Sequence, residues 1–198
     1  MGLWDIRPYS SVRGGTMSAR QAPMTALGTA FLPGEVVIVA PGAGTVSIAP
    51  QDGTQLVIAD GVAGVAINGP GLATATAEKP AASGYGRQYQ HPDTGNTYAT
   101  GDAIWFLPFG EGNLFSTRVV LAAGGAAAGA AFTGADRGAA FELTYCSGTT
   151  PDLGWGLERT AGVYGTDYVA EVMDVLDANG RAVTATGTGV TAVFRVLI

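Results

Sequence analysis

Short runs of apolar and β-branched residues alternate with turn signals along most of the chain, and this spacing limits the fold more than any other feature. In the first half of the chain, the runs cover 35–40, 45–49, 55–59, 62–67 and 72–77, and Pro-Gly, Asp-Gly and Asn-Gly-Pro sequences separate several of them. Turn signals about every 8–12 residues are typical of antiparallel sandwiches and barrels, whereas βαβ folds need helical stretches between strands. We therefore expect a mainly β protein with a compact β-barrel or β-sandwich body.

The same character returns in 102–198. Strands are expected at 103–107, 114–122, 141–145 and 192–198, a Gly/Ala stretch of low information covers 124–131, and 149–156 has the Pro and Gly content of a turn region. The segment 168–176 fits two structures. Its apolar spacing suits one helix face, with Asp167 as N-cap, but its β-branched content and the following Asn179-Gly180 favour a hairpin. We expect a strand here.

Two segments differ from this body. Residues 1–34 hold three arginines and one aspartate, several prolines and glycines, and no sustained period, so we expect an extended N-terminal arm. The polar, Tyr/Gly-rich segment 78–101 joins the β units 35–77 and 102–198 and is expected to be a contact loop, a marker between two β units, or a small hairpin turning at 93–96. The domain organisation is therefore an arm, 1–34, and a β body, 35–198.

Charge is scarce in this chain and argues for a partner protein. The 198 residues are 47% apolar and 13% charged, with a net charge of −6. A generic nucleic-acid binder would be basic, and neither uncharged run, 61–77 or 119–135, is apolar enough for a membrane span. No apolar leader follows Met1, so we expect synthesis in the cytoplasm without a signal peptide. Because charge keeps monomers apart, we expect a partner to cover much of this surface; the alternative is a monomer with a Gly-, Ala- and Thr-rich exterior.

No set of residues has the spacing of a catalytic or metal site. The chain has one histidine, His91, and no nucleophile motif with which it could form a catalytic triad. It has one cysteine, Cys146, and no basic residue next to it in sequence that would lower its pKa. Asp174, Asp177 and Asn179 lack the full spacing of a calcium-binding loop. We therefore expect a protein that is not an enzyme and that needs no metal or cofactor.

The arrangement of an arm before a turn-rich β body resembles the capsid cement, or decoration, proteins of tailed bacteriophages. The matching positions are Gly2, Leu3, Arg7, Pro8, Gly14, Gly15, Gly34-Glu35-Val-Val, Gly112-Asn-Leu-Phe115, Gly138, Glu142-Leu143 and the final Phe194–Ile198 run. Trp4-Asp5-Ile6 stands between Leu3 and Arg7 as an insertion relative to that pattern.

The resemblance implies a virion structural protein that is assembled in the host cytoplasm and acts as a homo-oligomer, either a dimer or a trimer. On the capsid surface it would bind the major capsid protein and cement neighbouring capsomers. Arginine and aromatic residues dominate binding hot spots, so the expected capsid contacts in the arm are Trp4, Arg7, Tyr9, Arg13 and Arg20. Two alternatives stay open. The protein could be another virion component, such as a head fibre, tail-tube or tail-tip protein, or it could be a β-sandwich carbohydrate-binding module with a stacking platform among Tyr85, Tyr89, Tyr98 and Trp105.

Overall fold

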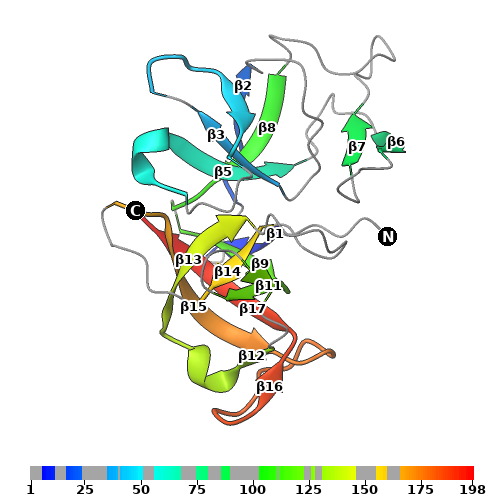
Figure 1. The fold of residues 1–198 in the computed structure, drawn as a ribbon, viewed down its shortest axis with the longest axis vertical. Coiled ribbons are helices and arrows are strands. Elements are labelled where there is room, and N and C mark those ends of the chain that lie inside the picture. The colour runs from blue at the N-terminus through cyan, green and yellow to red at the C-terminus, as the bar shows by residue number, and fades with distance from the viewer. Residues whose placement is uncertain are drawn as a thin grey trace.

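The fold is mainly β, as expected, and its barrel-like body consists of two large sheets packed against each other. The computed structural model describes residues 6–11, 17–23, 35–39, 41–50, 56–67, 75–79, 86–89, 103–110, 112–122, 126–127, 131–145, 155–159 and 166–198. In Figure 1 the smaller sheet lies above the larger one, and the chain ends between them.

The larger sheet has eight strands, and the chain contributes them from both ends and the middle. Their order is β1 (Ile6–Ser11), β9 (Asn113–Thr117), β17 (Thr191–Leu197), β15 (Val169–Leu176), β13 (Ala140–Tyr145), β14 (Trp155–Glu158), β10 (Val120–Ala122) and β11 (Ala126–Ala127). All neighbouring pairs are antiparallel except β10 and β14, which are parallel.

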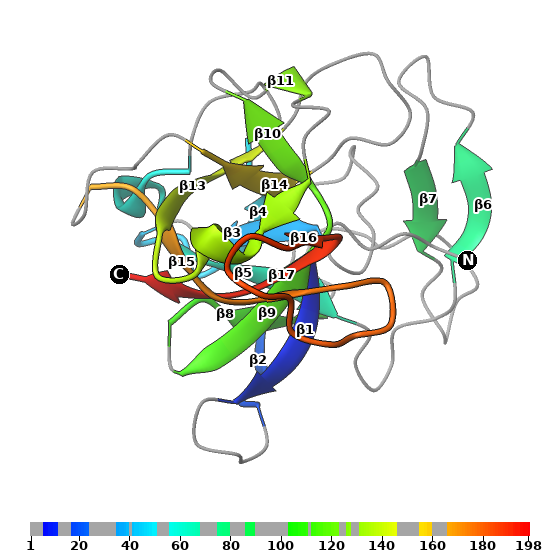
Figure 2. The same ribbon diagram turned by 90° about the horizontal axis from the view of Figure 1, so that it is seen from below.

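The smaller sheet has five antiparallel strands, in the order β2 (Arg20–Pro23), β8 (Ala103–Pro108), β5 (Val62–Ile67), β3 (Val36–Val39) and β4 (Val46–Ile48). Two short antiparallel pairs accompany the sheets: β6 (Ala75–Lys79) with β7 (Gly86–Tyr89), and β12 (Phe132–Thr133) with β16 (Thr188–Gly189). Figures 1 and 2 both place β6 and β7 to one side of the two sheets.

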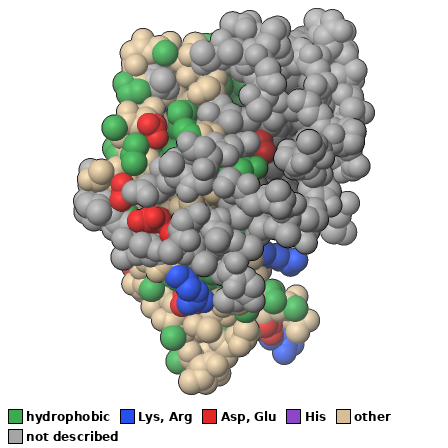
Figure 3. All heavy atoms as spheres, viewed as in Figure 1, with side chains coloured by type: hydrophobic (Ala, Val, Ile, Leu, Met, Phe, Trp, Pro, Cys, Tyr) green, Lys and Arg blue, Asp and Glu red, His purple; other side chains and the backbone are tan. Residues whose placement is uncertain are grey.

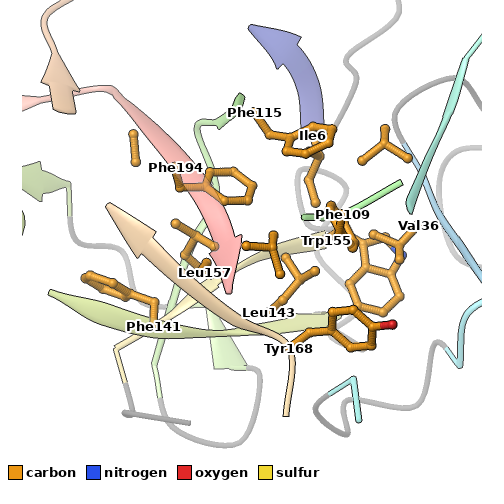
Figure 4. Close-up of a cluster of buried hydrophobic side chains, with 14 of the residues drawn as sticks. Ile6, Val36, Phe109, Phe115, Phe141, Leu143, Trp155, Leu157, Tyr168 and Phe194 are labelled. Carbon is orange, nitrogen blue, oxygen red and sulfur yellow. The ribbon is translucent and has the colours of Figure 1, made fainter. Parts of the chain in front are cut away.

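Alternation along the central strands of the smaller sheet buries both of its faces. Val36 and Val65 belong to the main core, which lies between the two sheets, whereas Val37 and Ala66 belong to a second cluster on the opposite face. Strands buried on both faces have continuous apolar sequences, which is why 36–39 reads Val-Val-Ile-Val. Figure 4 shows the main core, in which Phe115 and Phe194 from adjacent strands lie with ring centroids 6.0 Å apart.

Several sequence expectations are confirmed, and others are wrong for local reasons. The ambiguous segment 168–176 contains strand β15, and a tight turn follows at Asp177, whose Oδ1 accepts hydrogen bonds from the backbone N–H groups of Asn179 and Arg181. The expected strand 55–59 is instead a single bridge at Val57 followed by the 3₁₀ turn η1 (Ile58–Asp60).

The run 114–122 is not one strand, because it divides into β9 and β10. Thr117 Oγ1 accepts a hydrogen bond from the backbone N–H of Val119 at 3.1 Å, and this local bond turns the chain between the two strands. The expected turn region 149–156 overlaps β14, whose first two residues are Trp155 and Gly156. The proposed hairpin turn at 93–96 lies outside the described residues.

Tyr168 joins the two sheets directly. It leads into β15, and its hydroxyl accepts a hydrogen bond from the backbone N–H of Ala63 on β5 at 3.0 Å and donates one to the carbonyl of Gly61. Its own backbone N–H bonds the carbonyl of Leu56 at 2.9 Å. Tyr168 is 2% exposed, and burial raises the pKa of its phenol; the hydrogen bond from Ala63 lowers this pKa by less, and the charge of Asp60 raises it slightly.

Replacing Tyr168 with phenylalanine should lower the free energy of unfolding by about 1–3 kcal/mol, because the buried N–H of Ala63 loses its acceptor. Urea denaturation measures this loss. The matched control is Tyr9→Phe, which removes a hydroxyl from a side chain that is 52% exposed and should change stability by less than about 0.5 kcal/mol. Equal stabilities of the two variants would contradict the role assigned to Tyr168.

Candidate interaction surface

The arm contributes an edge strand to the larger sheet, and this strand has one buried and one exposed side. Ile6 is fully buried in the main core, whereas the next residue, Arg7, is exposed. Successive side chains of a strand point to opposite faces, so anchoring Ile6 turns Arg7 outward. Strand β1 pairs only with β9 in the described sheet, with Arg7 opposite Ser116.

Tyr9 occupies an irregularity of the same strand. The register between β1 and β9 shifts between Pro8 and Ser10, so Tyr9 is the extra residue, and its side chain is 52% exposed. Proline inside a sheet is confined to edges and bulges, because it has no N–H to donate. Proline and a bulge also hinder further strand pairing at an edge. Tyr9 and Arg7 therefore offer side chains, rather than a regular strand edge, to a partner.

On the same face of the sheet, two acidic side chains of β15 are paired with arginines. Arg195 on β17 contacts the carboxylate of Glu171 on β15 at 2.6 Å, and Arg137 contacts that of Asp174 at 2.7 Å. Arg137 also donates to the carbonyl of Val183 at 2.5 Å. Arg7 makes no ion pair with any other residue that the structure describes, so its charge is available to a partner. Surface pairs of this kind add little stability, but they balance the charge around Arg7.

The other expected contact residues are dispersed. Arg20 is exposed on β2, at the edge of the smaller sheet, where the neighbouring Ala22 belongs to the second apolar cluster. Trp4 and Arg13 lie outside the described residues. The structure thus brings Arg7 and Tyr9 together on one strand and places Arg20 on a different sheet.

The structure describes few of the aromatic residues that the carbohydrate-binding alternative requires. Trp105 lies on β8 and is partly buried, and its indole Nε1 is buried with no hydrogen-bond partner among the described residues. Tyr85 and Tyr98 lie outside the described part of the chain, and Tyr89 is described only as part of strand β7.

Within the part of the chain that the structure covers, no three His, Cys, Asp or Glu side chains gather closely enough to hold a metal ion. His91 and Cys146 lie outside that part. Asp174 and Asp177, considered above as calcium ligands, have structural roles: Asp174 pairs with Arg137, and Asp177 closes its turn. Among the same residues, no helix is long and apolar enough to cross a membrane.

A buried carboxylate cluster went unnoticed in the sequence. Glu142, Glu158 and Asp167 are 8%, 4% and 2% exposed, and Glu142 lies directly opposite Glu158 across β13 and β14. Burial raises the pKa of Glu142, and the charges of Glu158 and Asp167 raise it further. The alternation of 141–145 places Glu142 on the face opposite the core, but no sequence signal pairs it with a residue 16 positions away.

Comparison with known proteins adds no relative. No protein-family model matches the chain, and no curated protein and no solved structure is significantly similar to it.

Replacing Ile6 with alanine should lower the free energy of unfolding by about 2–5 kcal/mol, the usual cost of truncating a fully buried isoleucine. Arg7→Ala, one residue away on the exposed side, should change it by less than about 0.5 kcal/mol. Thermal unfolding of both variants measures the difference. If Ile6→Ala unfolds at the wild-type temperature, strand β1 does not contribute to the core.

Proposed function

We propose that this protein is a non-enzymatic virion structural protein that binds the outer surface of a bacteriophage capsid and cements neighbouring capsomers. The observation that carries the proposal is the anchored strand β1, which buries Ile6 in the core and exposes Arg7 and Tyr9 on the same short segment. The resemblance of the arm and body to capsid cement proteins supports the identity of the partner as the major capsid protein.

The residue types on β1 suit a protein–protein contact. Arginine and tyrosine are enriched among the residues that dominate binding energy. Because Ile6 and the pairing with β9 hold the strand in place, its ordering cost is met on folding, and less is lost on binding. Tyr9 offers a large apolar ring, and Arg7 offers a charge that no described residue neutralises.

The sparse charge of the molecule supports a surface that is covered in an assembly. In the view of Figure 3 the described acidic and basic side chains are scattered among polar and apolar atoms. A homodimer or homotrimer with several copies of the β1 surface would gain strength from multivalency, since each further contact is made at a high effective concentration. Modest single contacts then suffice for a stable lattice.

The direct test is cosedimentation of the full chain with expanded, empty heads from a panel of tailed bacteriophages. Saturable binding at a fixed ratio to the major capsid protein supports cementing. The double variant Arg7→Ala/Tyr9→Ala should bind at least about 30-fold more weakly, because loss of hot-spot residues costs about 2 kcal/mol or more. Binding to isolated tails instead of heads would favour a tail component.

A matched control is Arg181→Ala, which removes an exposed arginine from the turn after β15 and should leave binding unchanged. Point substitutions are preferable to deleting the arm, because deletion of 1–30 would also remove β1 and β2 from the two sheets. Wild-type affinity in the folded double variant would overturn the assignment of the contact to β1. Absence of binding to any head would overturn the cement function.

A further inference from the structure

The strands β13 and β14 carry two glutamates in direct opposition. Glu142 and Glu158 are cross-strand partners, and both are at least nine-tenths buried. Residues directly opposite each other in an antiparallel pair have Cβ atoms about 4.5–5.5 Å apart, and like charges in these positions destabilise the pair. Asp167 belongs to the same group, since it lies two residues before Val169, the β15 partner of Glu142. We call these three residues the acidic face.

Among the described residues, the other polar groups on this side of the sheet do not offset the repulsion felt by Glu142. Thr144, two residues from Glu142, is fully buried, and its hydroxyl has no hydrogen-bond partner among the described residues. Glu171 on β15 adds a further carboxylate, and the arginine opposite it, Arg195 on β17, is already bonded to it at 2.6 Å. Glu158 and Asp167 each make a further interaction.

Burying three neighbouring carboxylates as anions is costly, so one of them is favoured in its neutral form. Glu142 is the member flanked by both others, through Glu158 on β14 and Asp167 next to β15. Burial raises its pKa, and the charges of Glu158 and Asp167 raise it further. Glu142 lies on β13, between β14 and β15. It is therefore the carboxylate of the acidic face that binds the proton.

We propose that the acidic face makes the pairing of β13 with β14 dependent on a proton held by Glu142. Strand β14 connects β13 to β10 and β11 at the end of the larger sheet. Loss of the proton places two anions opposite each other and weakens this connection. The end of the sheet formed by β14, β10 and β11 then opens more readily at higher pH, while the rest of the sheet keeps its pairing.

The direction of the pH effect follows from proton linkage. Below the ordinary pKa of 4.5, Glu142 is protonated in both the folded and the unfolded chain, and it adds no pH dependence. Between 4.5 and the raised pKa of the folded state, only the folded chain holds the proton. The contribution of Glu142 should therefore raise the unfolding constant with pH in this window, by at most about tenfold per pH unit. Above the window the loss of stability is complete.

The test compares urea unfolding of the full chain and of Glu142→Gln from pH 4 to pH 8. Glutamine keeps the size of the side chain and cannot ionise. We expect the variant to match wild type at pH 4 and to have a higher urea midpoint at pH 8. Amide hydrogen exchange at pH 8 should be slower in the variant at 155–158 and 120–122, and unchanged in β1 and β9.

The control is Glu171→Gln, which removes a carboxylate of the same sheet face that is paired with Arg195 and should not raise the midpoint at pH 8. A second readout does not depend on the variant being stable: the infrared absorption of protonated carboxyl groups should persist to higher pH in folded wild type than in the unfolded chain.

Two results would overturn the proposal. One is a constant difference between wild type and Glu142→Gln across the pH range, together with protonated carboxyl groups that persist to no higher pH in the folded chain than in the unfolded chain. The other is a rise of the wild-type midpoint at pH 8 on adding calcium, reversed by EDTA and absent in Glu142→Gln. That result would mean that the acidic face holds a cation rather than a proton.

Discussion

The hydrogen bonds of the Tyr168 hydroxyl join the two sheets at one buried point within the core that packs between them. They reach from the entry of β15 in the larger sheet to Ala63 and the adjacent Gly61 beside β5 in the smaller one. Phe109, whose backbone N–H bonds the carbonyl of Ala63, packs with its ring centroid 6.0 Å from that of Tyr168. Polar and apolar contacts thus meet at one point, and the main core of Figure 4 extends from it between the sheets.

This sheet packing explains why the arm has an ordered segment. A sheet that buries one face needs apolar side chains up to its edge strand, and Ile6 supplies one beside Phe115 and Phe194 in the same core. The edge is the position where a strand exposes its other face and its outer backbone groups to a partner. Pro8 and the irregularity at Tyr9 fit this position and no central one. Core packing and the proposed partner contact therefore use opposite faces of the same strand.

Much of the β structure was predictable, and the exceptions have local causes. Continuous apolar runs such as 36–39 and alternating runs such as 141–145 are strands in the structure, because burial of one or both faces leaves that pattern. Strand β14 was missed because Gly156 reads as a turn residue. A Cβ there would lie 2.5 Å from Val119 Cγ1, so the glycine permits close approach within the sheet. The turn at 58–60 depends on Asp60, whose carboxylate faces the N–H of Val57.

The residues proposed to have a function differ in the same way. Residue type alone marked Arg7 and Tyr9 as candidate contacts, and one strand with a buried Ile6 suffices to expose them, because alternation is a local property. The opposition of Glu142 and Glu158 depends on the register of two strands and on burial by the rest of the chain. Proton binding in the acidic face is thus a property of tertiary structure. Only 13% of the residues are charged, so three buried carboxylates in one place are more unusual in this chain than in a highly charged protein.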